Sequence, residues 1–198
     1  MDILLIGANG VLGTAVSTTL AARGHRIIRV GRTSGDILAD ITDKTGLTRV
    51  YDEAGPVDAV VSAAGDAPFK PFAELDADDY LSAYRGKVAA QIDLVRHGLD
   101  RLPDRGSFTL VSGVLAREPI PSGSAAAMAN GAVEAFVRSA AIEIAPRRIN
   151  AVSPTVFTES VPAYGPYFPG MPPVDLAEVA QAFVRSVEGG LTGQVFIP

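Results

Sequence analysis

The feature that most constrains this chain is its regular alternation of short apolar runs with segments of helical periodicity. Residues 3–6 are continuously apolar and end at Gly7, which is typical of a strand buried on both faces of a parallel sheet. Over 81–99, apolar residues recur in steps of three and four, which predicts one face of a long helix. We expect strands over 3–6, 26–30, 57–62, 107–112, 148–152 and 194–197, a short extended piece at 36–40, and helices from 11 to a stop at Gly24 and over 44–54, 81–99, 125–145 and 176–187.

Strands and helices that alternate in this way form a parallel sheet with helices on both faces. The sequence has no internal repeat or low-complexity linker, so residues 1–198 are expected to form one domain. The predicted fold is α/β, a single doubly wound Rossmann domain with about seven parallel strands. In such sheets ligands bind beyond the carboxyl ends of the strands, so the residues just after each strand are the informative ones. The Pro-rich segment 154–173 has no clear period and is expected to be a loop.

Composition excludes several classes of function. The net charge of −5 argues against a protein that grips nucleic acid backbones. The absence of Cys excludes disulfides, thiolate metal sites and a Cys nucleophile, and two isolated His do not make a metal site. No apolar run approaches the ~18 residues of a membrane span, and the first residues do not resemble a signal peptide. We therefore expect a cytoplasmic protein that acts on a small molecule, with no metal, nucleic acid or membrane partner.

The first predicted strand runs directly into a glycine-rich turn. Residues 7–13 read Gly-Ala-Asn-Gly-Val-Leu-Gly, and a helical pattern follows at once. Glycines permit a tight turn and close approach of the backbone to a diphosphate, and the free N–H groups of a helix N-terminus bind anions. We expect a dinucleotide site formed by Gly7, Asn9, Gly10, Val11, Leu12 and Gly13. The alternative is a glycine-rich turn that binds nothing.

The residues after the second strand indicate which dinucleotide is bound. An NAD site usually has a carboxylate here for the ribose 2′-hydroxyl. This chain has Arg32, Thr33 and Ser34 instead, and a guanidinium can bind a 2′-phosphate through two hydrogen bonds. The pattern favours NADP(H) over NAD(H). A solvated surface Arg32 is one alternative, and Asp36, farther along the loop, is the carboxylate that would favour NAD.

Together these motifs resemble the short-chain dehydrogenase/reductase family over nearly the whole chain. Asp40-Ile41 is similar to the pair that the family uses at the adenine ring, and Ser62-Ala63-Ala64-Gly65 is similar to its Asn-Ala-Ala-Gly turn. Residues 150–154 resemble its Asn-x-Val-x-Pro-Gly segment, with Thr155 in place of the Gly, and 131–136 resemble the helix after its catalytic Lys. The resemblance implies that the cofactor site also includes Asp40, Ile41, Ala63, Ala64, Gly65, Pro154, Val156 and Thr158.

The catalytic residues of the family do not carry over. The resemblance aligns Ala126 with the family's Tyr, Asn130 with its Lys and Gly113 with its Ser, and its Asn falls near Lys87. Ala126 has no proton to give, and Asn130 cannot lower a neighbouring pKa as a cation does.

Three functions remain compatible with the sequence. The first is a reductase or dehydrogenase for a small carbonyl or alcohol, in which Lys87 polarises the carbonyl and Ser112 assists. The second is an NADP-binding regulatory or scaffold protein that has lost redox chemistry, and the third is a non-redox enzyme. Lys87 could equally be a surface lysine, and Ser112 a hydroxyl bonded to backbone.

The family pairs the helix at 125–145 and the long helix before it across subunits. The Ala-rich sequence of 125–145 permits close helix approach, so we expect a homodimer or homotetramer. The alternative is a helix that is buried against its own sheet, which would have a similar sequence. No charge pattern in 114–124 or 155–173 identifies the substrate; Arg117 could contact an acidic substrate or only water.

Overall fold

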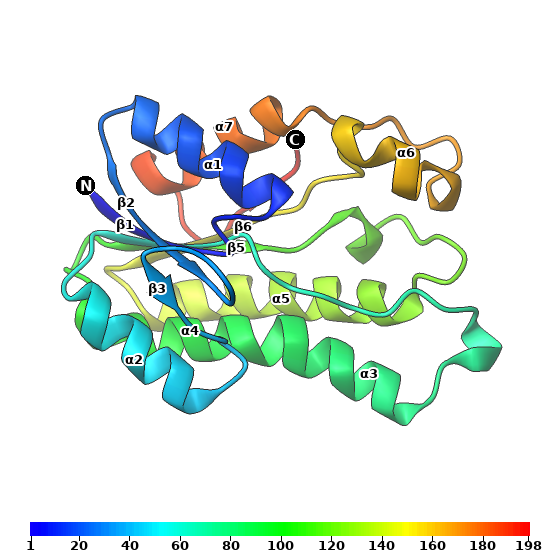
Figure 1. The fold of residues 1–198 in the computed structure, drawn as a ribbon, viewed down its shortest axis with the longest axis horizontal. Coiled ribbons are helices and arrows are strands. Elements are labelled where there is room, and N and C mark those ends of the chain that lie inside the picture. Colours follow the sequence, from blue (N-terminus) through cyan, green and yellow to red (C-terminus); the bar gives the residue numbers. More distant parts are fainter.

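A computed structural model describes all of residues 1–198. Seven parallel strands form one sheet in the order β3-β2-β1-β4-β5-β6-β7 (Figure 1). The strands are β1 (Asp2–Ile6), β2 (Arg26–Gly31), β3 (Ile37–Leu38), β4 (Ala59–Ser62), β5 (Ser107–Val111), β6 (Arg148–Val152) and β7 (Val195–Phe196). The chain builds outward from β1 to β3 and then returns to place β4 on the other side of β1. The fold class is therefore confirmed, with its topological switch point between β1 and β4.

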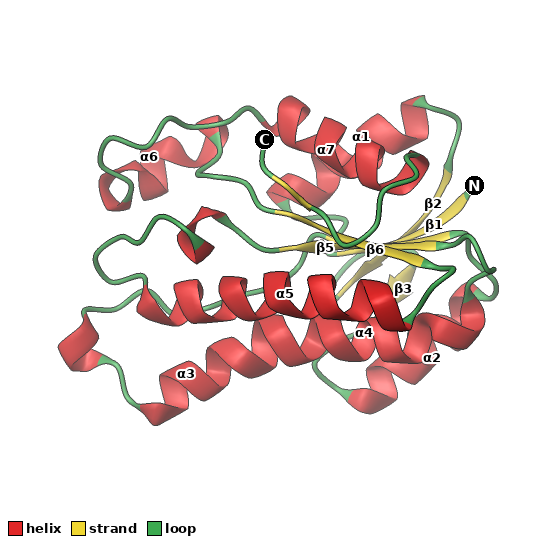
Figure 2. Ribbon diagram, turned by 180° about the vertical axis from the view of Figure 1, so that it is seen from behind, coloured by secondary structure: helices red, strands yellow, loops and turns green.

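Helices cover both faces of the sheet. They are α1 (Val11–Ala22), α2 (Lys44–Ala54), α3 (Ala77–Ala83), α4 (Ala90–Gly98), α5 (Ser124–Glu143), α6 (Val161–Tyr164) and α7 (Leu176–Glu188). Figures 1 and 2 show α1 and α7 side by side on one face, and α2, α4 and α5 on the other. Each face has its own apolar core, which explains why the central strands are buried on both sides. None of the helices combines the length and hydropathy needed to cross a bilayer.

The register of the strands brings three turns to the same edge of the sheet. Ile6, the last residue of β1, pairs with Val30 of β2 and with Ser62 of β4. The turns that follow β1, β2 and β4 therefore begin within one residue of the same level. This alignment gathers the segments predicted to bind the cofactor at the switch point.

The long helix predicted over 81–99 begins earlier and is not uniform. Asp76 caps α3: its carboxylate accepts the Asp79 N–H at 2.9 Å, and the Asp79 carboxylate accepts the Asp76 N–H at 3.2 Å. This reciprocal pair fixes the helix start at Ala77. α3 and α4 are joined by a π-helical stretch, Tyr84–Ala89, which contains Lys87. Such wider turns are frequent at functional sites. We call the continuous helical segment from α3 to α4 the α3–α4 rod.

The expectation that 154–173 is a loop throughout is wrong. The segment contains the short helix α6 between two 3₁₀ turns, Thr158–Ser160 and Gly165–Tyr167. The prediction was based on the prolines of this segment, but proline is compatible with the first turn of a helix. The N–H group that it lacks has no partner at that position anyway. α6 and the last of these turns both have a Pro in that position.

Candidate functional site

A cavity of about 830 Å³ opens at the carboxyl edge of the sheet, at the switch point between β1 and β4. Its wall is formed by the turns after β1, β2, β3 and β4, together with residues of the α3–α4 rod. Of the residues predicted to bind the cofactor, it includes Gly7, Asn9, Gly10, Arg32, Thr33, Ser34, Asp40, Ile41, Ala63, Ala64 and Gly65.

The glycine turn after β1 has the geometry of a phosphate cradle. Gly7 has a φ of +75°, a conformation that favours glycine, and its N–H donates to the Val30 carbonyl at 2.9 Å. A Cβ on Gly13 would lie 2.0 Å from the Gly7 carbonyl oxygen, so α1 packs directly on the turn. Gly10 caps α1 without any side-chain hydrogen bond. The first N–H groups of α1 therefore keep the donor capacity that an anion needs.

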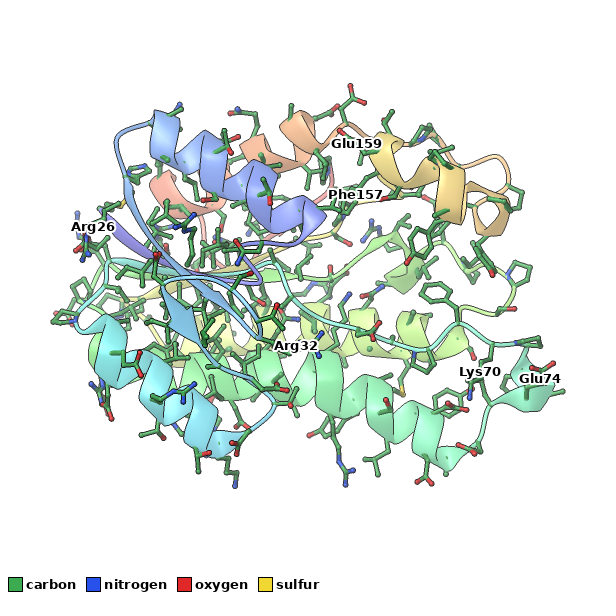
Figure 3. All side chains as sticks on the ribbon, viewed as in Figure 1. Arg26, Arg32, Lys70, Glu74, Phe157 and Glu159 are labelled. Atoms are coloured by element: carbon green, nitrogen blue, oxygen red, sulfur yellow. The ribbon has the colours of Figure 1, made fainter.

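The turn after β2 is tied to the glycine turn. The Asn9 amide Nδ2 donates to Ser34 Oγ at 2.8 Å. Arg32 follows β2 directly at the cavity wall (Figure 3) and forms no ion pair within the protein. Asp36, the carboxylate that would favour NAD, accepts the Arg29 N–H at 2.8 Å and the Arg29 Nη2 at 3.3 Å. The Arg29 guanidinium lowers the pKa of Asp36. The Asp36 side chain is thus paired with a residue that lies outside the cavity wall.

Asp40 and Ile41 line the cavity beyond β3. The Asp40 carboxylate accepts the Thr42 N–H at 2.9 Å and the Thr42 hydroxyl at 2.7 Å. These two hydrogen bonds lower the pKa of Asp40, and the nearby Arg32 adds a smaller effect in the same direction.

Six predicted cofactor residues lie outside the cavity wall. Leu12 and Gly13 are buried, and the Leu12 side chain belongs to the core between the sheet and α1, so only its backbone can reach a ligand. Val11 is exposed at the start of α1. Thr158 donates its hydroxyl to Asp175 at 2.6 Å. Pro154 and Val156, which follow β6, are buried.

Lys87 reaches inward from the π-helical stretch. A Cβ on Gly65 would lie 2.8 Å from Lys87 Cγ, so the lysine stem passes over the turn after β4. Its Nζ donates to the main-chain carbonyl of Ser112 at 3.2 Å. Burial lowers the pKa of Lys87 to about 8, and the negative charge of Asp66 opposes this shift. An amine with this pKa is able to give and take a proton near neutral pH.

The Ser112 hydroxyl is already occupied, because it donates to the Glu134 carboxylate at 3.0 Å in a buried setting. Its main-chain carbonyl, not its hydroxyl, is the group that contacts Lys87. Asn130 is only 4% exposed and packs against Gly113, where a Cβ would lie 3.0 Å from its Nδ2.

Two buried polar atoms close to this end of the sheet have no hydrogen-bond partner. They are Asn130 Oδ1 and Thr155 Oγ1. Burial of an unpaired polar atom costs about 1–3 kcal/mol, so folded proteins contain only a few such atoms. In the sequence, Thr155 is only a departure from a family motif, and Asn130 only a residue in the place of a lysine. Their free lone pairs are visible only in the folded protein.

Ala126 lies in an apolar setting. It forms a small cluster with Val114 and Leu115, against which Phe168 and Met171 of the segment after β6 pack. Farther out, Phe69 and Tyr167 approach with ring centroids 6.2 Å apart, joining the segments that follow β4 and β6. No hydroxyl can therefore be supplied from position 126.

The comparisons with known proteins agree with this geometry. A family model described as "Enoyl-(Acyl carrier protein) reductase" matches residues 7–168, from the glycine turn to the segment after β6. The chain belongs to the short-chain dehydrogenase/reductase family. Among curated relatives, the hydroxynaphthalene reductase-like protein Arp2 of Metarhizium brunneum is 30% identical over an alignment of 211 positions, which covers 91% of this chain and 79% of that protein.

Two solved structures superpose closely on this chain. The protein lin1944 from Listeria innocua is 47% identical, with a TM-score of 0.96 over 100% of this chain and 98% of that one. A small-chain dehydrogenase in complex with NADPH is 23% identical, with a TM-score of 0.90 over 100% and 96% of the two chains, which is a likeness of fold.

Proposed function

We propose that this short-chain dehydrogenase/reductase binds NADP(H), in preference to NAD(H), and transfers hydride to or from a small carbonyl or alcohol substrate. The observation that carries the proposal is the cavity at the switch point, whose wall combines the glycine turn with an Arg32 that has no partner within the protein. The NADPH-bound structure of a protein with the same fold supports the choice of ligand class. The name of the curated relative, a reductase-like protein, supports the reaction class.

The residues at the cavity fit the parts of this dinucleotide. The N–H groups at the start of α1 suit a diphosphate, and Arg32, Thr33 and Ser34 suit a 2′-phosphate. Asp40 and Ile41 suit the adenine. Asn130 and Thr155 lie outside the cavity wall, beside the ends of β5 and β6, where the unpaired Asn130 Oδ1 can accept a hydrogen bond and the Thr155 hydroxyl can donate one. When bound, NADPH supplies the hydride.

Lys87 is the proposed proton donor of the reduction. Its ammonium group can hold the oxygen of a substrate carbonyl and pass a proton to it as negative charge develops there. The Ser112 carbonyl, 3.2 Å from Nζ, orients the amine, so Ser112 serves through its backbone. In the direction of oxidation the neutral amine takes the proton back. We expect the rate of reduction to fall as the pH rises through about 8, where Lys87 loses its proton.

Calorimetric titration with NADPH and NADH tests the cofactor assignment. Arg32→Ala should weaken NADPH binding about 10- to 100-fold, because a charge-assisted hydrogen bond contributes about 1.5–3 kcal/mol, and should leave NADH binding unchanged. Arg29→Ala is the matched control, since Arg29 lies three residues before Arg32, on β2, and pairs with Asp36 outside the cavity wall. Equal losses for the two nucleotides, or no binding of either by the wild type, would contradict the assignment.

A second candidate is a cofactor-binding protein without redox activity. The apolar cluster around Ala126 favours it, because no hydroxyl is present at that position. Oxidation of NADPH, followed at saturating cofactor with aromatic and aliphatic ketones, separates the two candidates. Turnover by the wild type that is lost in Lys87→Met supports the reductase, whereas tight NADPH binding without any turnover supports the second candidate.

We also propose that the protein assembles as a homodimer or homotetramer through the helical layer that contains α4 and α5. Several large apolar side chains of this layer are exposed in the single chain: Leu81, Tyr84, Met128 and Ile142. Such residues favour association when they meet a second copy.

A further inference from the structure

A single buried carboxylate joins the ends of β5 and β6, at the carboxyl edge of the sheet where the cavity opens. Glu134, on α5, is only 3% exposed. Its Oε1 accepts hydrogen bonds from Ser112 Oγ at 3.0 Å, from Ser153 Oγ at 2.8 Å and from Arg117 Nη1 at 3.0 Å. Hydrogen bonds to a charged acceptor are roughly twice as strong as neutral ones. We call Glu134, Ser112, Ser153 and Arg117 the carboxylate hub.

The hub connects the ends of β5 and β6 with the loop between β5 and α5. Ser112 follows β5, Ser153 follows β6, and Arg117 donates both to the Ser153 hydroxyl, at 2.8 Å, and to Glu134. A backbone hydrogen bond from the Val114 N–H to the Pro154 carbonyl, at 2.8 Å, ties the same two segments together farther out. Glu134 of α5 therefore holds both segments in place.

Each tethered segment carries one group of the proposed site. The Ser112 hydroxyl belongs to the hub, while the carbonyl of the same residue accepts a hydrogen bond from the Lys87 ammonium. Ser153 precedes Pro154 and Thr155 by one and two positions, and Thr155 has the unpaired hydroxyl. A shift of either strand end would move these groups, although Glu134 itself contacts neither Lys87 nor Thr155.

We infer that Glu134 is a positioning residue, which acts through Ser112 and Ser153 to hold Lys87 and Thr155 in the geometry that the reaction needs. This inference rests on the proposed function, because it assigns Glu134 a part in the same reaction. Displacement of a reacting group by about 1 Å can lower a rate about 100-fold. A carboxylate that fixes two loops at once is therefore able to control turnover from outside the cavity.

The chain supplies a matched control. Arg138, one helical turn from Glu134, also forms an ion pair with it, through Oε2 at 3.4 Å. Its side chain is 59% exposed, and its only side-chain hydrogen bond is with Glu134. Arg138→Ala therefore removes a cation from the same carboxylate without touching β5 or β6.

The test compares Glu134→Gln, Ser112→Ala and Arg138→Ala with the wild type. Glu134→Gln removes the charge but keeps the size of the side chain, and Ser112→Ala removes one tether while leaving every charge in place. We expect kcat to fall about 10- to 100-fold in the first two variants, with the NADPH dissociation constant changed less than about 3-fold. Arg138→Ala should match the wild type in both.

A second readout does not require turnover. The rate at which acetic anhydride labels Lys87, measured by mass spectrometry across a pH series, gives the pKa of its amine. Loss of the aligned Ser112 carbonyl removes a hydrogen bond to the ammonium, so this pKa should decrease in Glu134→Gln and Ser112→Ala and stay unchanged in Arg138→Ala. Ser112→Ala keeps the inference testable if Glu134→Gln does not fold.

The outcomes separate the inference from the proposed function. Wild-type kcat and wild-type labelling in both Glu134→Gln and Ser112→Ala, even with a lower melting temperature, would overturn the positioning role. If the wild type binds NADPH but reduces nothing, the proposed reaction fails, and the labelling experiment alone then decides whether Glu134 positions Lys87.

Discussion

The sharpest test of the phosphate cradle is one added methyl group. In Gly13→Ala, the new Cβ would lie 2.0 Å from the Gly7 carbonyl oxygen and 2.8 Å from Ala8 Cα. The closer contact must open by about 1.4 Å to reach the 3.4 Å at which ordinary van der Waals contact begins. Both neighbours are backbone atoms of a tight turn, so neither can rotate away. The start of α1 and the turn after β1 must therefore move apart.

Overpacking of this kind lowers the free energy of unfolding by about 1–3 kcal/mol. For a chain of this length, that corresponds to a decrease in melting temperature of about 2–12 °C. Because the displaced atoms are the ones that would surround the diphosphate, we also expect NADPH affinity to fall at least about 10-fold. Thermal denaturation with and without NADPH measures both effects.

Gly131→Ala is the control, since it makes the same change in the interior of α5. Nothing lies within 4 Å of a Cβ at that position. The substitution should raise stability by about 0.5–1 kcal/mol, because alanine favours the helix more than glycine does. The two variants should thus shift the melting temperature in opposite directions. A Gly13→Ala protein that is as stable as the wild type and still binds NADPH would refute the cradle.

Three further predictions follow from individual contacts. Lys87→Met should stabilise the protein at pH 7 by up to about 3 kcal/mol. The pKa of Lys87 in the folded protein is about 8, below the ordinary 10.5, so the buried ammonium destabilises the folded state below pH 8. That gain should shrink as the pH rises from 8 to 10.5, and a gain independent of pH in thermal denaturation would contradict it. Asp76→Ala removes the cap of α3 and should cost about 1 kcal/mol, or about 2–4 °C in melting temperature, with NADPH binding unchanged. Ile142→Asp places a charge at a side chain that is 83% exposed in the single chain, and light scattering should show a smaller assembly than the wild type forms; an unchanged mass would count against the proposed α4–α5 interface.

The sequence by itself determined the architecture and one half of the site. Alternating apolar runs and helical faces are local signals, and they predicted the seven-stranded sheet. The glycine turn and Arg32 lie directly after their strands, so parallel pairing had to bring them to one edge. The sequence did not determine every helix boundary: the α3–α4 rod starts at Ala77 and includes a π-helical stretch. It also did not predict the short helix α6 after β6, because the segment is rich in proline.

The tertiary structure decided the other half. Three features of the site depend on contacts between segments far apart in the chain. Lys87 points inward, the Ser112 hydroxyl is held by Glu134, and Asn130 and Thr155 have unpaired atoms. Lys87 and Ser112 are separated by 25 residues, and Glu134 and Ser153 by 19. No periodicity or motif records which atoms of such residues meet, because hydrogen-bond geometry is fixed only when helix and sheet pack together.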